Sequence, residues 1–132
     1  MPTLLIAQVA VGLWFTVLFV QSGLDKVFDF KGNLEWLSGH FGQSPLNGVV
    51  RPMLATITLV ELAAGVLSGL GSVMLALQQG PFVLQLGLGA SCAALLMLFF
   101  GQRVAKDYPG AATLVPYFFL AVAGFVLPEL AR

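Results

Sequence analysis

Charged side chains are scarce in this 132-residue sequence: they make up 9% of it, whereas hydrophobic residues make up 58%. A soluble domain contains roughly 25% charged and about 45–50% apolar residues. So few charges cannot cover a globule of this size with a solvated surface, and a water-soluble single domain is excluded as the default. The six basic and six acidic residues cancel. This balance argues against a nucleic-acid-binding protein, which needs a basic face for phosphates.

Cysteine and histidine are nearly missing too, with one of each, Cys92 and His40. A lone cysteine forms no internal disulfide or Cys-x-x-Cys dithiol, and the sequence has too few ligands for a zinc, haem or di-iron site. We therefore predict no metal site and no self-contained enzyme: redox chemistry would need a bound organic cofactor or a partner chain. We expect His40 in an interfacial loop and Cys92 as a small packing residue.

Long uncharged apolar stretches are abundant. A bilayer core about 30 Å thick is crossed by roughly 20 apolar residues of helix. The sequence predicts four such spans, at about residues 3–24, 53–77, 82–101 and 111–127. The predicted fold class is all-α, a single transmembrane four-helix bundle over residues 1–132.

A short interfacial segment is expected between the first two spans. Asn33 is predicted to cap a short helix that runs through His40. The apolar residues of this segment suit either a helix in the membrane interface, with Trp36 at headgroup depth, or a loop folded back over the mouth of the bundle.

Basic residues are distributed unevenly over the connections between spans. The first connection contains Lys26, Lys31 and Arg51. The third contains Arg103 and Lys106, and the second contains neither Lys nor Arg. The positive-inside rule then predicts that the first and third connections are cytoplasmic and that both termini are outside. The apolar N-terminal block is too long, and too poor in preceding basic residues, for a secretory signal peptide.

Small and polar residues recur at helical spacing in each span, which is typical of inward faces in a membrane bundle. In the first and second spans these residues are Gln8, Gly12, Thr16, Phe19, Ser22 and Lys26, and Thr58, Glu61, Gly65, Ser68 and Ser72. In the third and fourth they are Gln85, Gly89 and Cys92, and Gly110, Thr113, Tyr117, Leu120 and Gly124. Pro116 is predicted to bend the fourth span.

Glu61 is a charged residue inside a predicted span. It lies about eight residues into that span, roughly 12 Å deep at 1.5 Å per residue. An ionised carboxylate there costs about 2.5–3.5 kcal/mol or more, so it must be protonated, paired or hydrated. We predict an intramembrane polar cluster in which Glu61 pairs with Lys26 or Arg103. Tyr117 and Gln21, at a similar depth, are expected to support it.

This predicted cluster has two interpretations that the residues leave open. The structural one is that the cluster only sets the register and orientation of the helices. The functional one is that it binds the polar head of a quinone-like or lipid ligand, or passes a proton.

Three segments contain sequence signatures. The first is QSGLDKVF at residues 21–28, with a G-x-x-K pattern, and the second is LVELAAG at residues 59–65, with an E-x-x-x-G pattern. The third is GQRVAKDYPG at residues 101–110, followed by Tyr117 and Phe118. In their order and their placement relative to the four spans they resemble the DoxX family of small bacterial four-span membrane proteins, over nearly the whole chain. The matching family positions are Gly23, Lys26, Glu61, Gly65, Arg103 and Asp107.

The resemblance implies an accessory subunit of a membrane-associated, quinone-linked redox assembly in the bacterial inner membrane. The wider group includes a subunit of a thiosulfate:quinone oxidoreductase, maturation factors for redox enzymes and chaperone-like membrane proteins. The alternative is therefore a non-catalytic scaffold, assembly or chaperone-type protein. A transporter or channel subunit is a third, weaker reading because the chain has no internal repeat. The expected ligand is a non-covalent quinone or lipid. The expected partners are the lipid bilayer and either other redox subunits or a second copy of the chain.

Overall fold

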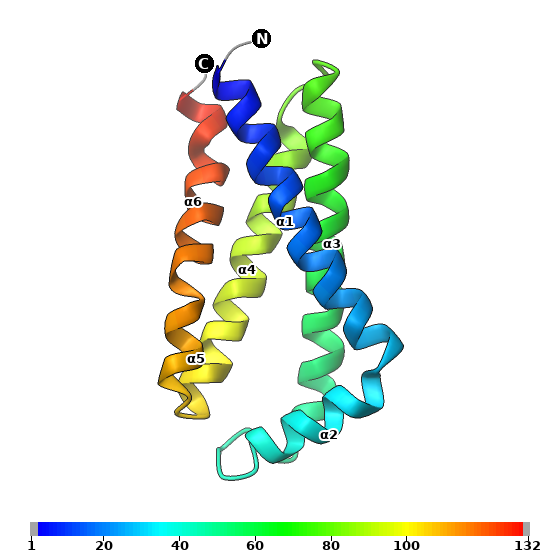
Figure 1. Cartoon of the computed structure of the whole chain (residues 1–132), viewed down its shortest axis with the longest axis vertical. Helices are drawn as coiled ribbons and strands as arrows, with labels where there is room; N and C mark the ends of the chain where they lie inside the picture. Colours follow the sequence, from blue (N-terminus) through cyan, green and yellow to red (C-terminus); the bar gives the residue numbers. More distant parts are fainter. Residues whose placement is uncertain (1–2, 131–132) are drawn as a thin grey trace.

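The computed structural model describes residues 3–130, and all of the regular elements in that range are α-helices. Their bounds are α1 Thr3–Phe28, α2 Phe30–His40, α3 Val50–Ala76, α4 Phe82–Val104, α5 Tyr108–Thr113 and α6 Val115–Leu130. In Figure 1 the long helices run along the long axis of the molecule. Both ends of the chain lie at the same end of the bundle as the α3–α4 turn, whereas α2 crosses the opposite end.

Four stretches of helix are long and apolar enough to cross a membrane: α1, α3, α4 and the combined α5–α6. The prediction of an all-α bundle with four membrane-spanning helices is thus confirmed, and the chain is a multi-pass membrane protein. The helices extend a few residues beyond most of the predicted span limits. The 26 residues of α1 reach about 39 Å, more than the hydrocarbon core needs. A charged residue therefore ends the apolar stretch without ending the helix.

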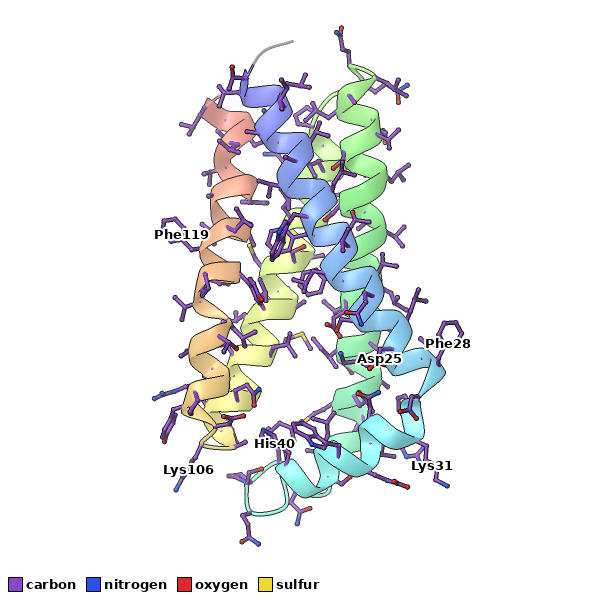
Figure 2. All side chains as sticks on the ribbon, in the orientation of Figure 1. Asp25, Phe28, Lys31, His40, Lys106 and Phe119 are labelled. Carbon is purple, nitrogen blue, oxygen red and sulfur yellow. The ribbon has the colours of Figure 1, made fainter. Side chains whose placement is uncertain are left out.

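The outside of the bundle is apolar. Val17, Phe28, Leu59 and Phe119 are each at least 70% exposed. Figure 2 shows Phe28 and Phe119 pointing away from the bundle, and Lys31 and Lys106 at the end where α2 lies. Such a surface suits contact with lipid chains, which are as apolar as these side chains.

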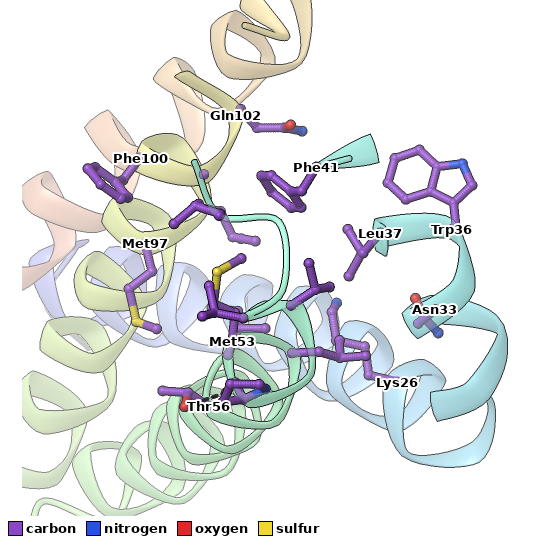
Figure 3. Close-up of a pocket in the computed structure, with 18 of the residues that line it drawn as sticks. Lys26, Asn33, Trp36, Leu37, Phe41, Met53, Thr56, Met97, Phe100 and Gln102 are labelled. Carbon is purple, nitrogen blue, oxygen red and sulfur yellow. Dashed lines mark hydrogen bonds between the residues drawn. The ribbon is translucent and has the colours of Figure 1, made fainter. Parts of the chain in front are cut away.

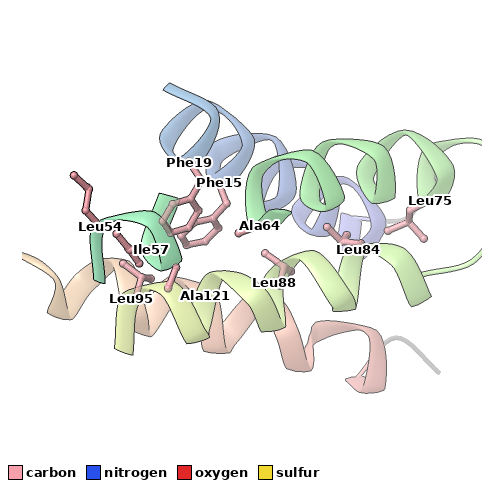
Figure 4. Packing of buried hydrophobic residues seen from close by; sticks show 11 residues of the cluster. Phe15, Phe19, Leu54, Ile57, Ala64, Leu75, Leu84, Leu88, Leu95 and Ala121 are labelled. Carbon is pink, nitrogen blue, oxygen red and sulfur yellow. The ribbon is translucent and has the colours of Figure 1, made fainter. Parts of the chain in front are cut away.

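The hydrophobic core lies between α1, α3 and α4, with Ala121 added from α6. Its largest fully buried apolar side chains include Phe15 and Phe19 of α1, whose rings stack with their centres 5.8 Å apart, and Leu84 and Leu88 of α4 (Figure 4). Small residues let the helices approach closely beside this core. A Cβ atom on Gly71 would collide with the backbone of Leu84, so α3 and α4 touch there backbone to backbone.

The inward faces agree with the sequence patterns in part. All five members of the α3 pattern are buried. On α4, however, the buried face contains Gly87 and Ser91, whereas Gln85, Gly89 and Cys92 are only half-buried. Gly87 meets Ser68 of α3, whereas Gly89 faces Phe125 of α6, so the most buried face of α4 is the one turned toward α3. In the fourth pattern only Gly124 is buried.

Two helix boundaries also differ from the sequence-based expectation. The cap of α2 is Asp29, whose side chain accepts a hydrogen bond from the Gly32 amide at 3.2 Å, so the helix begins about one turn before Asn33. The expected bend of the last span is a break at Leu114, between α5 and α6. Pro116 has no amide hydrogen with which to continue the helical bonding across this point.

Candidate functional site

Glu61 and Lys26 form an ion pair inside the bundle. The Nζ atom of Lys26, near the end of α1, lies 2.9 Å from Oε1 of Glu61 on α3. The Glu61 side chain is 2% exposed and the Lys26 side chain 15% exposed. The cost of a buried carboxylate is thus offset by an ammonium group at contact distance, together with one hydrogen bond to its other oxygen.

Ser22 completes this cluster. Its hydroxyl donates to Oε2 of Glu61 at 2.7 Å and accepts from Nζ of Lys26 at 2.8 Å. The three side chains therefore close a ring in which both carboxylate oxygens of Glu61 have partners and the charges cancel. We refer to Ser22, Lys26 and Glu61 as the polar triad. Ser22 was assigned to the inward face of its span but not to the cluster. Its spacing of four residues from Lys26 on the same helix could have indicated that the two side chains lie close together.

Two glycines flank the triad and explain how α1 comes so close to α3. A Cβ atom on Gly65 would lie 2.9 Å from the backbone nitrogen of Val20, and one on Gly23 would lie 2.7 Å from Cγ of Leu62. Both distances are shorter than a side chain tolerates. Gly23 and Gly65 thus have a packing role on each side of Glu61.

The other residues predicted for the cluster lie elsewhere. The guanidinium of Arg103 sits over the ring of Tyr108, 4.4 Å from its centre, near the end of α4. The ring of Tyr117 packs 5.3 Å from that of Trp14, and Gln21 is exposed on the outer side of α1. Of the two predicted partners of Glu61, Lys26 and not Arg103 forms the ion pair, and the expectation that Tyr117 and Gln21 support it was wrong. It rested on equal depth, and depth does not determine toward which neighbour a helix face turns.

Asp107 begins α5 and contacts the end of α2. Its carboxylate accepts a hydrogen bond from the Gly110 amide at 3.0 Å, and its other oxygen lies 3.6 Å from Nε2 of His40. The same His40 nitrogen is 2.9 Å from Oε1 of Gln102. His40 is the last residue of α2, as the predicted short helix through His40 requires, and not a loop residue. It links α2 to the end of α4 across 62 positions of sequence, a separation that no local pattern reveals.

A cavity of about 960 Å³ lies between α2, the first turns of α3 and the last turns of α4. Its walls are apolar apart from Lys26, Asn33, Thr56, Gln102 and the indole of Trp36. Figure 3 shows Leu37 and Phe41 on the α2 side of the cavity, and Met97 and Phe100 on α4 at the opposite side. The remaining lining residues are Leu46, Val49, Val50, Pro52, Met53, Leu54, Ile57, Leu96, Leu98 and Gly101.

The cavity is closed at one side and open at another. Phe41 is buried and lies over Gly101, where a Cβ atom would be 3.4 Å from the ring. On the open side the lining residues Thr56, Leu96 and Phe100 are exposed. The cavity is thus open between α3 and α4, and also beside α2, where the lining residues Trp36 and Val49 are exposed. The polar triad contributes Lys26 to the wall.

The comparisons with known proteins give no relative for this chain: no family model matches the sequence, no curated protein matches it and no solved structure matches the fold. Over residues 3–130, no three His, Cys, Asp or Glu side chains come together in a group that could hold a metal ion. The polar triad and the adjoining cavity are therefore the features on which a functional proposal must rest.

Proposed function

We propose that this protein is a DoxX-type accessory subunit of a quinone-linked redox assembly in the bacterial inner membrane, and that its cavity holds one quinone-like amphipathic molecule. The cavity is the observation that carries this proposal. Its volume of about 960 Å³ lies within the range of roughly 300–1,000 Å³ that is usual for small-molecule sites. Its mainly apolar wall with a few polar groups is also usual for such sites.

The opening between α3 and α4 supports a ligand that arrives through the bilayer. Leu96 and Phe100, at 59% and 61% exposure, border the cavity on the lipid-facing surface. A molecule with a long apolar tail could enter sideways, leave its tail among the lipid chains and bring its head toward Lys26. The chain's own residues supply binding and orientation, and the electrons would come from a partner subunit.

The test is chemical analysis of what the purified protein retains. We expect extraction of protein purified from bacterial membranes in mild detergent to release a quinone in near-stoichiometric amount. Met97→Trp, which fills the cavity from α4, should abolish retention, whereas Val122→Trp on the exposed face of α6 should not. Recovery of a stoichiometric partner chain without any quinone would contradict quinone binding and support the scaffold alternative.

Orientation in the membrane forms part of the same proposal. Lys31 and Lys106 lie at the α2 end of the bundle, which the positive-inside rule assigns to the cytoplasm. In a Cys92→Ser background, Gln79→Cys should react with a membrane-impermeant maleimide added to intact spheroplasts, and Ser44→Cys should not. Labelling in the opposite pattern would contradict periplasmic termini.

A further inference from the structure

The polar groups that border the cavity are mostly occupied by partners within the chain. The Thr56 hydroxyl donates to the carbonyl of Pro52 at 2.8 Å, and the Asn33 amide donates to the carbonyl of Asp29 at 2.9 Å. Oε1 of Gln102 is taken by His40 at 2.9 Å. None of these three groups brings a charge to the cavity. The character of the site toward a ligand head is therefore decided by Lys26.

Lys26 presents a donor whose charge is already balanced. An ammonium group has three hydrogens, and the strong contacts of Nζ are to Glu61 at 2.9 Å and the Ser22 hydroxyl at 2.8 Å. Its third contact, to the backbone carbonyl of Ser22, is long at 3.5 Å. The third hydrogen is thus only weakly engaged, and an acceptor on a ligand could replace this long contact, while the positive charge is matched by the carboxylate of Glu61.

From this geometry we infer that the cavity selects an uncharged amphiphile whose head carries carbonyl acceptors, and that the polar triad sets this selectivity. A carbonyl oxygen at Lys26 gains a charge-assisted hydrogen bond without adding charge. A carboxylate, sulfate or phosphate at the same place would come close to the carboxylate of Glu61 in a site of low dielectric constant, where repulsion between like charges is strong. The inference rests on the proposed ligand cavity and specifies the chemical class of its ligand.

Tryptophan fluorescence gives a direct readout because Trp36 lines the cavity, whereas Trp14 packs against Tyr117. The probe is decylubiquinone, a quinone with a short tail, added to the full-length protein in detergent micelles. Quenching should be lost in Trp36→Phe and retained in Trp14→Phe. If wild-type protein shows no quenching that depends on Trp36, the proposed function fails together with the inference.

Competition then tests the head group separately. Methyl palmitate is an uncharged ester and hexadecyl sulfate is a permanently charged amphiphile with a tail of similar length. We expect methyl palmitate to displace decylubiquinone from wild-type protein at a concentration about tenfold lower or more, the factor that corresponds to one hydrogen bond of typical strength. Equal displacement by both competitors would overturn the inference and leave the proposed cavity intact.

Variants of the triad should shift this preference in a defined way. Glu61→Gln leaves the positive charge of Lys26 without its counter-charge. The ratio of the two displacing concentrations should therefore change by at least about tenfold in favour of hexadecyl sulfate. The charge-balanced double variant Lys26→Met/Glu61→Gln should retain Trp36 quenching and show no preference. Arg103→Gln changes the charge outside the cavity wall and should preserve the wild-type ratio. An unchanged ratio in both triad variants would also overturn the inference.

Discussion

The two ends of this bundle are built differently. At the closed end, beside the chain termini and the α3–α4 turn, the helices touch backbone to backbone, as at Gly71 and Leu84. At the open end, where α2 lies, the cavity separates α3 from α4. Helix α2 and the turns that follow it border this cavity. The polar triad lies next to this cavity, because Lys26 both pairs with Glu61 and lines the wall.

In this way a small membrane protein can combine a closely packed region with a region that leaves a cavity open. Lipid gives little hydrophobic drive for helix association, so close packing through small residues must supply it. Once the closed end and the α1–α3 contact hold the bundle, the open end can leave space for a ligand. Its polar contacts, the triad and the His40 link, then keep that space in a defined shape.

The largest expected effect comes from breaking the triad. Lys26→Met leaves the buried carboxylate of Glu61 without its cation, and removing one partner of a buried pair costs about 3–5 kcal/mol. We expect a loss of about 3 kcal/mol in the free energy of unfolding, measured by titration of mixed micelles with a denaturing detergent and followed by circular dichroism. The double variant Lys26→Met/Glu61→Gln should recover most of it. If the free energy of unfolding of Lys26→Met lay within about 1 kcal/mol of the wild-type value, the ion pair would contribute little to stability.

A matched pair of glycine substitutions compares the two ends directly. Gly71→Ala places a methyl group against the backbone of Leu84 and should cost about 2–3 kcal/mol through overpacking. Gly101→Ala meets only the ring of Phe41 at ordinary contact distance. It should be neutral, or stabilising by up to about 1 kcal/mol, because alanine favours a helix. The same unfolding measurement applies to both, and equal costs would contradict the proposed difference between the ends.

The smallest effect is expected at the link between α2 and α4. His40→Ala removes the hydrogen bond to Gln102 and the stacking on Trp36, whose ring centre is 4.8 Å away. We expect a local loss of about 1 kcal/mol, seen as roughly fivefold faster amide hydrogen exchange over residues 41–49 with the closed end unchanged. Gln79→Ala, in the turn at the other end, serves as the control. Faster exchange throughout the bundle would instead assign His40 a global role.

Local pattern was sufficient to predict much of the fold. Hydropathy located the four spans, and the recurrence of Thr58, Glu61 and Gly65 located the buried face of α3. The pattern was less successful on α4, because Gly89 of the predicted face turns toward α6, whereas the buried face with Gly87 and Ser91 turns toward α3. For the same reason depth alone placed Tyr117 and Gln21 beside Glu61, although the contacts of a side chain depend on the rotation of its helix.

Length, apolarity and charge placement act locally along the chain, so they are enough to specify a four-span helical membrane protein with most of its basic residues toward one end. The sequence also made Glu61 a residue that needs a partner, since a lone buried carboxylate is costly. The choice of Lys26 and Ser22 as those partners, and the divergence of α3 and α4 around a cavity, become visible only in the folded chain. Those features depend on the rotation and crossing of helices far apart in sequence, which packing sets.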